Sequence, residues 1–284
     1  MLRALRGLRR RPLAMAGLVI LAMLVVSAIL APLIAPHDPY DQQLANRLLP
    51  PFWEQRGSTD NLLGTDRLGR DVLSRIIFGS RISLALSLTC SVLASVIGVG
   101  LGLLAGLRGG RLGELIMRIA DVQIAFPFLV LAIAVIAVFG AGFATLVVML
   151  SIFGWVQFAR LVRGDVLAIK EKEFVDAARA LGASNLRIAL RHVLPNVLSP
   201  VIVIWTFTIA QVVIVESALS FLGLGVQPPT PSWGSMLADG RNYLDTAWWL
   251  GTFPGLAIML TVMAVNLIGD GLRDVLDPRV SLDG

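Results

Sequence analysis

Residues 122–159 read VQIAFPFLVLAIAVIAVFGAGFATLVVMLSIFGWVQFA, a long run that contains no charged side chain. A membrane-spanning helix needs about 20 apolar residues, because the hydrocarbon core of a bilayer is about 30 Å thick. As a single helix this run would be about 57 Å long, so it must turn back on itself. Residues 139–143 (FGAGF) supply the turn, since glycine breaks helices. The run therefore predicts two membrane spans.

Four other uncharged runs are long enough to cross a bilayer. They are residues 12–36, 82–107, 193–215 and 246–269. The first run exceeds the roughly 7–15 apolar residues of a signal-peptide core, so we interpret it as a retained span. Together the runs predict an all-α integral membrane protein with about six transmembrane helices.

The composition agrees with this class. Of the 284 residues, 56% are hydrophobic and only 15% are charged, against about 25% charged in soluble domains. The net charge of +5 does not indicate nucleic acid, because the basic residues flank the apolar runs as membrane anchors do. The single cysteine, Cys90, excludes an intrachain disulfide, and His37 and His192 are far apart, so no metal site is predicted.

The basic residues also predict the orientation. With six spans both termini lie on one side, and the positive-inside rule places them in the cytoplasm. Most of the 24 lysines and arginines then face inward. The predicted cytoplasmic set is Arg3, Arg6, Arg9, Arg10, Arg11, Arg108, Arg111, Arg118, Arg160, Arg163, Lys170, Lys172, Arg179, Arg187, Arg191, Arg273 and Arg279.

Two long segments then lie outside. The first, residues 37–81, is rich in Pro, Asp and Arg, and we expect a short amphipathic helix at 71–78. The second, residues 223–245, is rich in proline and turn-forming residues. Tryptophans at or near this second segment suit a membrane interface: Trp233, Trp248 and Trp249.

The inner segment 160–192 is charged and has a helical pattern. Apolar and small residues recur at i, i+3, i+4 and i+7, which predicts one helical face: Phe174, Ala177, Ala178 and Leu181. Gly182 then interrupts the pattern, and Ser184 or Asn185 can cap a second short helix.

The second short helix is predicted over residues 184–193, and Pro195 marks the start of the next span. Its apolar stripe consists of Leu186, Leu190, Val193 and Leu194, and Arg187 and Arg191 form a basic edge. Two interpretations fit these helices. The apolar face packs on the membrane surface or on the chain's own bundle, or it docks into a groove on a partner.

Residues 173–182 (EFVDAARALG) and 191–196 (RHVLPN) resemble the EAA loop of bacterial ABC importer permeases. That loop has Glu-Ala-Ala, a glycine four residues after the second alanine, and a later Leu-Pro. Here Asp176 replaces the usual glutamate. His192 stands where isoleucine is frequent, which is similar to the peptide-transporter branch.

Other segments, in the same order, resemble the C-type permeases of the dipeptide/oligopeptide/nickel family. They are residues 63–75 (LGTDRLGRDVLSR) with 79–83 (GSRIS), 216–225 (ESALSFLGLG), 233–237 (WGSML) and 266–279 (NLIGDGLRDVLDPR). The resemblance covers nearly the whole chain. It implies an N-terminal region at 1–80, a permease domain at 81–276 with the EAA loop at about 160–195, and a cytoplasmic tail at 277–284.

The resemblance implies a transport subunit of the bacterial inner membrane. Such a permease pairs with a B-type permease to form the translocation pathway. Two ATPase subunits, which bind ATP and Mg²⁺, dock on the cytoplasmic loops, and a substrate-binding protein delivers the ligand from outside. Peptides are the expected substrate, and nickel or another small solute is the alternative.

The chain itself has no P-loop, because its only lysines, Lys170 and Lys172, do not follow a glycine. It also lacks HExxH and GxSxG motifs, so it is not predicted to be an enzyme. We expect the helix at 184–193 to couple the permease to the ATPase. The coupling residues are Asp176, Ala177, Ala178, Gly182, Leu186, Arg187, Leu190, Arg191, His192, Leu194 and Pro195.

Polar residues within spans are candidates for the pathway, because buried charge in a membrane usually faces a cavity or a partner. They are Asp121, Gln123, Gln211 and Glu216. Asp121 and Glu216 also fit the ends of spans, where charge is less costly. An ion-coupled secondary transporter is the alternative from another class, although it would typically show internal repeats and ionisable groups near the midplane.

Overall fold

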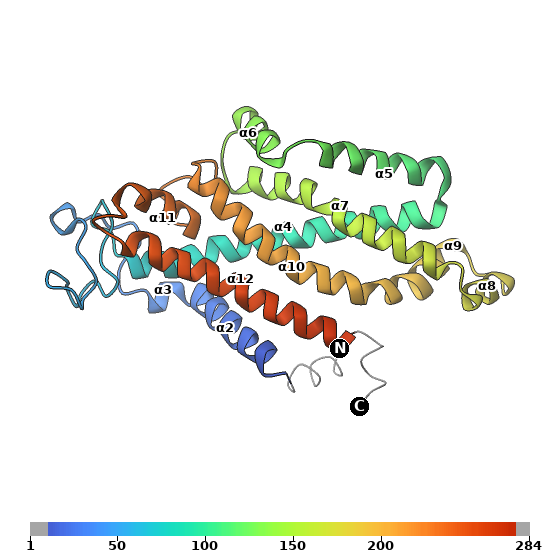
Figure 1. The fold of residues 1–284 in the computed structure, drawn as a ribbon, viewed down its shortest axis with the longest axis horizontal. Coiled ribbons are helices and arrows are strands. Elements are labelled where there is room, and N and C mark those ends of the chain that lie inside the picture. The colour runs from blue at the N-terminus through green and yellow to red at the C-terminus, as the bar shows by residue number, and fades with distance from the viewer. Residues whose placement is uncertain (1–10, 277–284) are drawn as a thin grey trace.

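The computed structural model describes residues 11–276, and every regular element in that range is a helix (Figure 1). An isolated bridge joins the backbones of Thr65 and Asp71. The predicted cytoplasmic residues Arg3, Arg6, Arg9, Arg10 and Arg279, and the predicted tail 277–284, lie outside the described residues.

Long helices form the membrane-spanning part. They are α2 (Pro12–Ile29), α4 (Val72–Arg108), α7 (Phe143–Ile169), α10 (Leu194–Phe221) and α12 (Trp249–Leu276). The shorter helices α5 (Gly110–Ala125) and α6 (Phe128–Phe139) could span a membrane only as a pair, and they meet at 90°. The described range therefore holds 5 candidate spans, or 6 if the bent pair counts as one, which confirms the predicted fold class.

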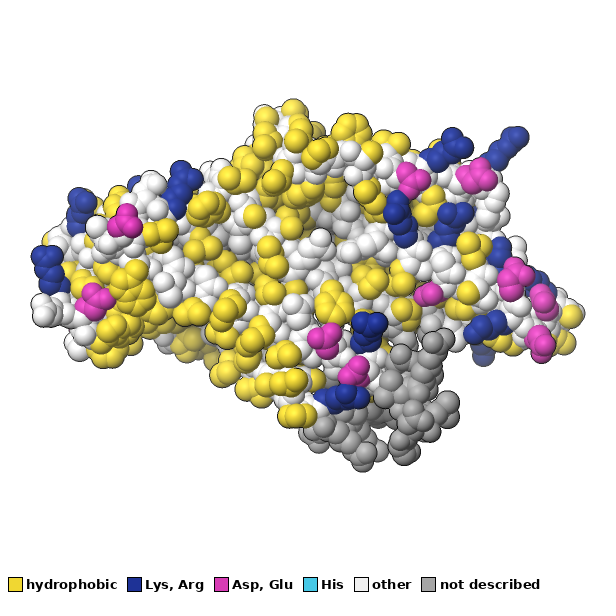
Figure 2. Space-filling view, in the orientation of Figure 1, with side chains coloured by type: hydrophobic (Ala, Val, Ile, Leu, Met, Phe, Trp, Pro, Cys, Tyr) yellow, Lys and Arg dark blue, Asp and Glu magenta, His cyan; other side chains and the backbone are white. Residues whose placement is uncertain are grey.

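Short elements connect the long helices. They are α3 (Ala31–Ile34), α8 (Glu173–Ala180), α9 (Asn185–Ile188), the π-helical turn Ala189–Val193, α11 (Trp233–Gly240), and the 3₁₀ turns Leu44–Asn46 and Arg241–Tyr243. We call residues 37–71 the cap and residues 170–193 the loop. The cap and the loop lie at opposite ends of the long axis (Figure 1). Figure 2 shows hydrophobic side chains between these ends and most charged side chains toward them.

The predicted turn in the long uncharged run is confirmed. Helix α6 ends at Phe139 and α7 begins at Phe143, and Gly140 has a φ of 81°, which suits glycine. The first half of the run is not one straight helix, because Phe126 is extended before Pro127. Proline disfavours a helical conformation in the residue before it, which explains the break between α5 and α6.

The predicted separate helix at 71–78 is wrong. These residues begin α4, a single helix of 37 residues and about 55 Å. The carboxylate of Asp71 caps its first turn by accepting a hydrogen bond from the Ser74 backbone N–H. The charge of Arg75 suggested a segment outside the membrane, but its guanidinium is neutralised inside the protein and the helix continues unbroken.

The predicted second helix of the loop is also not a separate element. Helix α9 continues through the π-helical turn into α10, so residues 185–221 run without interruption. Pro195 lies in the first turn of α10, as predicted for the start of a span. Because proline lacks an N–H and its ring clashes with a preceding carbonyl in a regular helix, a widened turn before it accommodates the ring.

Small residues let α4 and α7 pack closely. A Cβ atom added at Gly102 would lie 2.7 Å from the Ala159 carbonyl oxygen, so only glycine fits there. Helix α2 packs on α12 in the same way, since a Cβ atom at Gly17 would lie 2.6 Å from the Ala264 carbonyl. Figure 1 places α2 at one edge of the bundle and α5 and α6 at the opposite edge.

The prediction that Trp233 faces a membrane interface is wrong. Its side chain is fully buried, and its indole N–H donates to the Ile76 carbonyl of α4 at 3.1 Å. Helix α11 therefore closes against the start of α4. Trp248 remains half-exposed near the start of α12, whereas the Trp249 indole is buried and donates to the Thr65 carbonyl of the cap.

Candidate functional site

Two local signals shape the loop between α7 and α10. Gly182 ends α8 with a φ of 79°, and its N–H donates to the Arg179 carbonyl. The Ser184 hydroxyl accepts a hydrogen bond from the Arg187 N–H and caps α9. Both features agree with the sequence prediction. They hold α8 and α9 as two short helices around a tight turn.

One face of the loop packs into the bundle. Val175, Ile188 and Val193 are almost completely buried, and they share a hydrophobic cluster with Val166 and Ile169 of α7. This packing fixes the loop to the inner part of the bundle rather than leaving it free.

The opposite face exposes large apolar side chains. Leu181 is 88% exposed and Leu186 is 67% exposed. We call this face the loop surface, and its members are Phe174, Leu181, Leu186, Leu190, Arg187 and Arg191. The predicted stripe is therefore divided: Leu186 and Leu190 point outward, whereas Val193 is buried in the bundle. The π-helical turn shifts the helical register between them.

The other predicted coupling residues lie around this surface. Asp176, Ala177, Gly182 and Pro195 are exposed, and Ala178, His192 and Leu194 are half-buried. Asp176 forms an ion pair with Arg179 at 2.9 Å, and the rings of Phe174 and His192 are 6.4 Å apart. The structure thus brings the predicted residues to one end of the molecule.

A cavity of about 650 Å³ opens among the α5–α6 break, α7 and α10. Its polar lining comes from all three regions: Gln123, Gln157, Arg160, Thr208 and Gln211. Phe126, Phe128 and Phe153 supply aromatic walls. Non-helical backbone within a membrane is tolerated where it is buried in protein or lines a water-filled cavity. The break at residues 126–127 lines this cavity, as that rule requires.

Hydrogen bonds hold two of the cavity amides in place. The Trp155 indole N–H donates to the Gln123 side-chain oxygen at 2.9 Å, and the Gln123 amide donates to the Phe153 carbonyl at 3.1 Å. The Gln157 amide donates to the Thr208 hydroxyl at 2.8 Å. These partners reduce the rotamer freedom of the amides, so the polar wall is pre-organised.

Three of the four predicted pathway residues lie at or beside the cavity. Gln123 and Gln211 line it, and Asp121 forms an ion pair at 2.5 Å with Arg160, which also lines it. Glu216 lies elsewhere, fully buried, and accepts a hydrogen bond from the Ser220 hydroxyl at 2.7 Å.

Sequence reasoning missed Gln157, Arg160 and Thr208 as cavity residues. A signal for them exists in the spacing, because polar residues recur at i and i+3 on both α7 and α10. Gln157 precedes Arg160 on α7, and Thr208 precedes Gln211 on α10.

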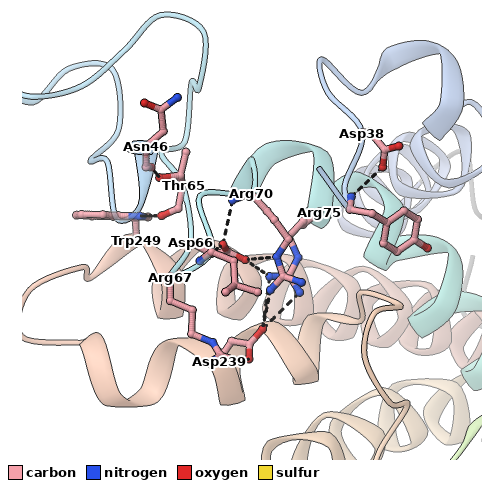
Figure 3. Close-up of polar contacts among 11 residues, drawn as sticks. Asp38, Asn46, Thr65, Asp66, Arg67, Arg70, Arg75, Asp239 and Trp249 are labelled. Carbon is pink, nitrogen blue, oxygen red and sulfur yellow. Dashed lines mark hydrogen bonds and ion pairs between the residues drawn. The ribbon is translucent and has the colours of Figure 1, made fainter. Parts of the chain in front are cut away.

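A second polar group, the ion cluster, ties the cap to the bundle (Figure 3). It consists of Asp66 and Arg70 of the cap, Arg75 of α4 and Asp239 of α11. Asp66 pairs with Arg70 at 2.7 Å and also with Arg75, and Asp239 contacts both arginines at 3.3–3.4 Å. The side chains of Asp66, Arg70 and Arg75 are at most 5% exposed. Three separate segments are therefore joined at one buried point.

The folded chain matches known permeases. The family described as "Binding-protein-dependent transport system inner membrane component" matches residues 98–282. The chain belongs to this family. The permease family described as "N-terminal TM domain of oligopeptide transport permease C" also matches residues 1–51. The protein is therefore a multi-pass inner-membrane permease subunit rather than an enzyme.

Relatives of this permease cover nearly its full length. The di/tripeptide transport system permease protein DppC of Pseudomonas aeruginosa is 45% identical over 267 residues, which are 94% of this chain and 88% of the relative. The glutathione transport system permease protein GsiD of Shigella flexneri is 46% identical over 275 residues, 97% of this chain and 89% of the relative.

A solved structure shares the fold of this permease. The inward-facing MetNI methionine ABC transporter aligns with a TM-score of 0.59 and 21% identity, and the alignment covers 72% of this chain and 96% of that chain. The two family matches and the relatives confirm the resemblance to ABC importer permeases inferred from sequence.

Proposed function

We propose that this permease forms one half of the translocation pathway for di- or oligopeptides in an ATP-driven importer, and that the loop surface receives an ATPase subunit. The observation that carries this proposal is the exposure of the leucines of the loop surface beside Arg187 and Arg191. An exposed apolar patch of this kind marks a protein interaction site. The apolar side chains fit a groove, and the two arginines complement acidic residues on its rim.

The loop is joined to α10 and packed on α7, so movement of an ATPase docked at the loop surface would also move the helices that line the cavity. Helix α9 continues into α10 without a break, and α10 contributes Thr208 and Gln211 to the cavity. Val175 and Ile188 seat the loop on α7, which contributes Gln157 and Arg160. A displacement of the loop surface by ATP-driven closure of the ATPases therefore reaches two walls of the cavity. Alternating access is then a two-state switch biased by nucleotide.

The cavity suits peptides. Glutamine amides offer both a donor and an acceptor, which is the pattern of a peptide group, so Gln123 and Gln211 can contact a backbone without selecting a side chain. Arg160 lines the cavity and pairs with Asp121 beside it, so a peptide zwitterion that displaces this ion pair meets a charge of the opposite sign at each of its ends. The relatives named for di/tripeptide and glutathione transport support this substrate class.

The partners follow from the same proposal. A B-type permease closes the open side of the cavity, two ATPases bind ATP and Mg²⁺ in the cytoplasm, and a substrate-binding protein docks at the cap end. The loop and both termini then lie in the cytoplasm. The domains are the N-terminal region 1–80, the permease domain 81–276 and the cytoplasmic tail 277–284.

The experiment is to purify the chain in lipid with a B-type permease, its ATPases and a peptide-loaded binding protein, and to measure ATP hydrolysis. Reversing both Arg187 and Arg191 to Glu should abolish ATPase co-purification or the stimulation by loaded binding protein. Arg111→Glu, an exposed basic residue outside the loop, is the matched control and should have little effect.

Two outcomes would count against the proposal. If the native chain binds no ATPase although its permease partner is present and folded, the docking role is wrong. If docking persists but peptides do not stimulate hydrolysis while a nickel complex does, the substrate class is wrong and the docking role stands.

A further inference from the structure

Residues 52–54 of the cap, which we call the cap tip, include two exposed aromatic side chains. Phe52 is 49% exposed and Trp53 is 52% exposed, and both follow Pro51 in a turn-rich segment. Side chains of this size normally bury most of their surface in a water-facing loop. Their exposure therefore indicates that something other than the described residues covers them.

These residues pack against the start of α12. The Trp53 ring lies 6.5 Å from that of Trp248 and 6.2 Å from that of Phe253, and the rings of Trp248 and Phe253 are 5.7 Å apart. We call Phe52, Trp53, Trp248 and Phe253 the aromatic cluster. The Trp248 indole N–H donates to the Glu54 carboxylate at 2.9 Å, which fixes the cap tip on the helix.

The position of α12 sets the level of the cluster in the membrane. Helix α12 is a candidate span and begins at Trp249, so its first turn lies where the span leaves the hydrocarbon. Phe253 directly follows that first turn, and Trp248 directly precedes the helix. Tryptophan is enriched at this depth, because its ring is apolar and its N–H can bond to headgroups or water.

The surroundings indicate that lipid covers this side. Below the cluster, α12 continues as an exposed apolar stripe of Leu256, Met259 and Met263, spaced at helical intervals. The neighbouring helix α2 packs its small residues on α12 and leaves most of its large apolar side chains exposed on its outer side. An apolar face of a membrane-spanning helix that no protein covers faces lipid. The polar cavity lies toward the opposite edge, beside α5 and α6 (Figure 1).

We propose that the aromatic cluster inserts into the phospholipid headgroup layer of the leaflet at the cap end and anchors the cap there. The cap is then held to lipid through Trp53, in addition to its attachments to protein through the ion cluster and through the Trp248 and Trp249 indoles. The anchor fixes the level of the cap at the membrane surface beside α12.

The test places a nitroxide at position 53 of the full chain, using Trp53→Cys in a Cys90→Ala background. The chain is labelled before it is assembled with its partner subunits in vesicles of phosphatidylethanolamine and phosphatidylglycerol. Accessibility to oxygen, which concentrates in lipid, is compared with accessibility to a water-soluble nickel chelate. The matched control is Asp60→Cys, an exposed position in the same cap. We expect position 53 to favour oxygen and position 60 to favour the chelate.

Two results would overturn the proposal. Chelate accessibility at position 53 equal to that at position 60 would place the cap tip in water. Shielding from both reagents would show that another protein subunit, rather than lipid, covers the cluster.

A second measurement avoids the label. In vesicles containing brominated lipid, Trp53→Phe should lower the share of tryptophan emission that bromine quenches. Trp233→Phe removes a fully buried indole and should leave the quenched emission nearly unchanged. An unchanged quenched share in Trp53→Phe would also reject the anchor.

Discussion

At the residue scale, the ion cluster gathers charged side chains that are mostly buried. Asp66 pairs with both Arg70 and Arg75 and, together with Asp239, balances their charges; the side chains of Asp66, Arg70 and Arg75 are almost completely buried. Asp66→Asn keeps the shape but removes one of the negative charges that balance them. Breaking a buried ion pair by removing one partner costs about 3–5 kcal/mol. We therefore expect a clear drop in the thermal midpoint of the purified protein.

Asp274→Asn is the control for this prediction, because Asp274 pairs with Arg11 on the surface. A surface pair contributes about 0–1 kcal/mol, so this variant should unfold close to the native temperature. Equal losses of stability in Asp66→Asn and Asp274→Asn would show that the buried ion cluster stabilises the fold no more than a surface ion pair does.

At the residue level, sequence reasoning succeeded where a residue bonds to residues close to it in sequence. Gly182 and Ser184 shape the loop through bonds within a few residues, and both were predicted. It failed where the partner is distant in sequence. Asp239 reaches Arg70 and Arg75 across more than half the chain, and no local pattern reveals that pairing. Trp233 was misplaced for the same reason, because its acceptor belongs to α4.

At the scale of the element, the continuous helix from α9 into α10 is the reason to expect that the loop surface is mechanically coupled to the cavity. Two glycines inserted after His192 would interrupt the helix between the loop surface and the cavity. The loop surface would remain, so ATPase co-purification should persist, whereas stimulation of hydrolysis by the loaded binding protein should fall strongly. The measurement is ATP hydrolysis by the reconstituted importer.

The same insertion between Gly109 and Gly110 is the control, because the chain already turns there with positive φ at both positions. If the insertion after His192 leaves stimulation at the native level, a rigid connection is not required and coupling runs through α7 alone.

Helix boundaries were predicted well where the length of an apolar run determines them, and poorly where tertiary packing determines them. The turn at 139–143 follows from length, because the run is too long for one span. The start of α4 does not follow from length. The charge of Arg75 suggests that the span begins after it, but within the fold Asp66 and Asp239 pair with Arg75 and the helix includes it. Pro127 indicates the break between α5 and α6, but no local sequence pattern gives its 90° angle.

At the scale of the whole molecule, a cavity with polar lining residues opens toward one edge of the bundle, and α2 and α12 expose apolar side chains at the opposite edge. We expect Gln211→Cys, in a Cys90→Ala background, to react with a water-soluble maleimide in vesicles, and peptide substrate to slow the reaction. Met259→Cys, on the exposed stripe of α12, should stay unreactive because lipid covers it. Labelling is read out by mass shift of the full chain.

Reaction at position 259 as fast as at position 211 would contradict this division of the molecule. The division itself could not be predicted from the sequence, because hydropathy identifies a span without showing which side of it faces lipid. Only the tertiary arrangement assembles Gln123, Gln157 and Gln211, from three regions of the chain, around one cavity.

The unbroken length of α4 has a mechanical consequence. One end is clamped to the cap and α11 through Arg75, and the other ends at Gly109 beside the start of α5. A stiff rod of about 55 Å that pivots near its middle acts as a lever: a tilt of about 5° moves its tips about 2 Å in opposite directions. A protein that binds at the cap end and tilts α4 would therefore displace the end of α4 near Gly109. The movement would pass along the helix mechanically.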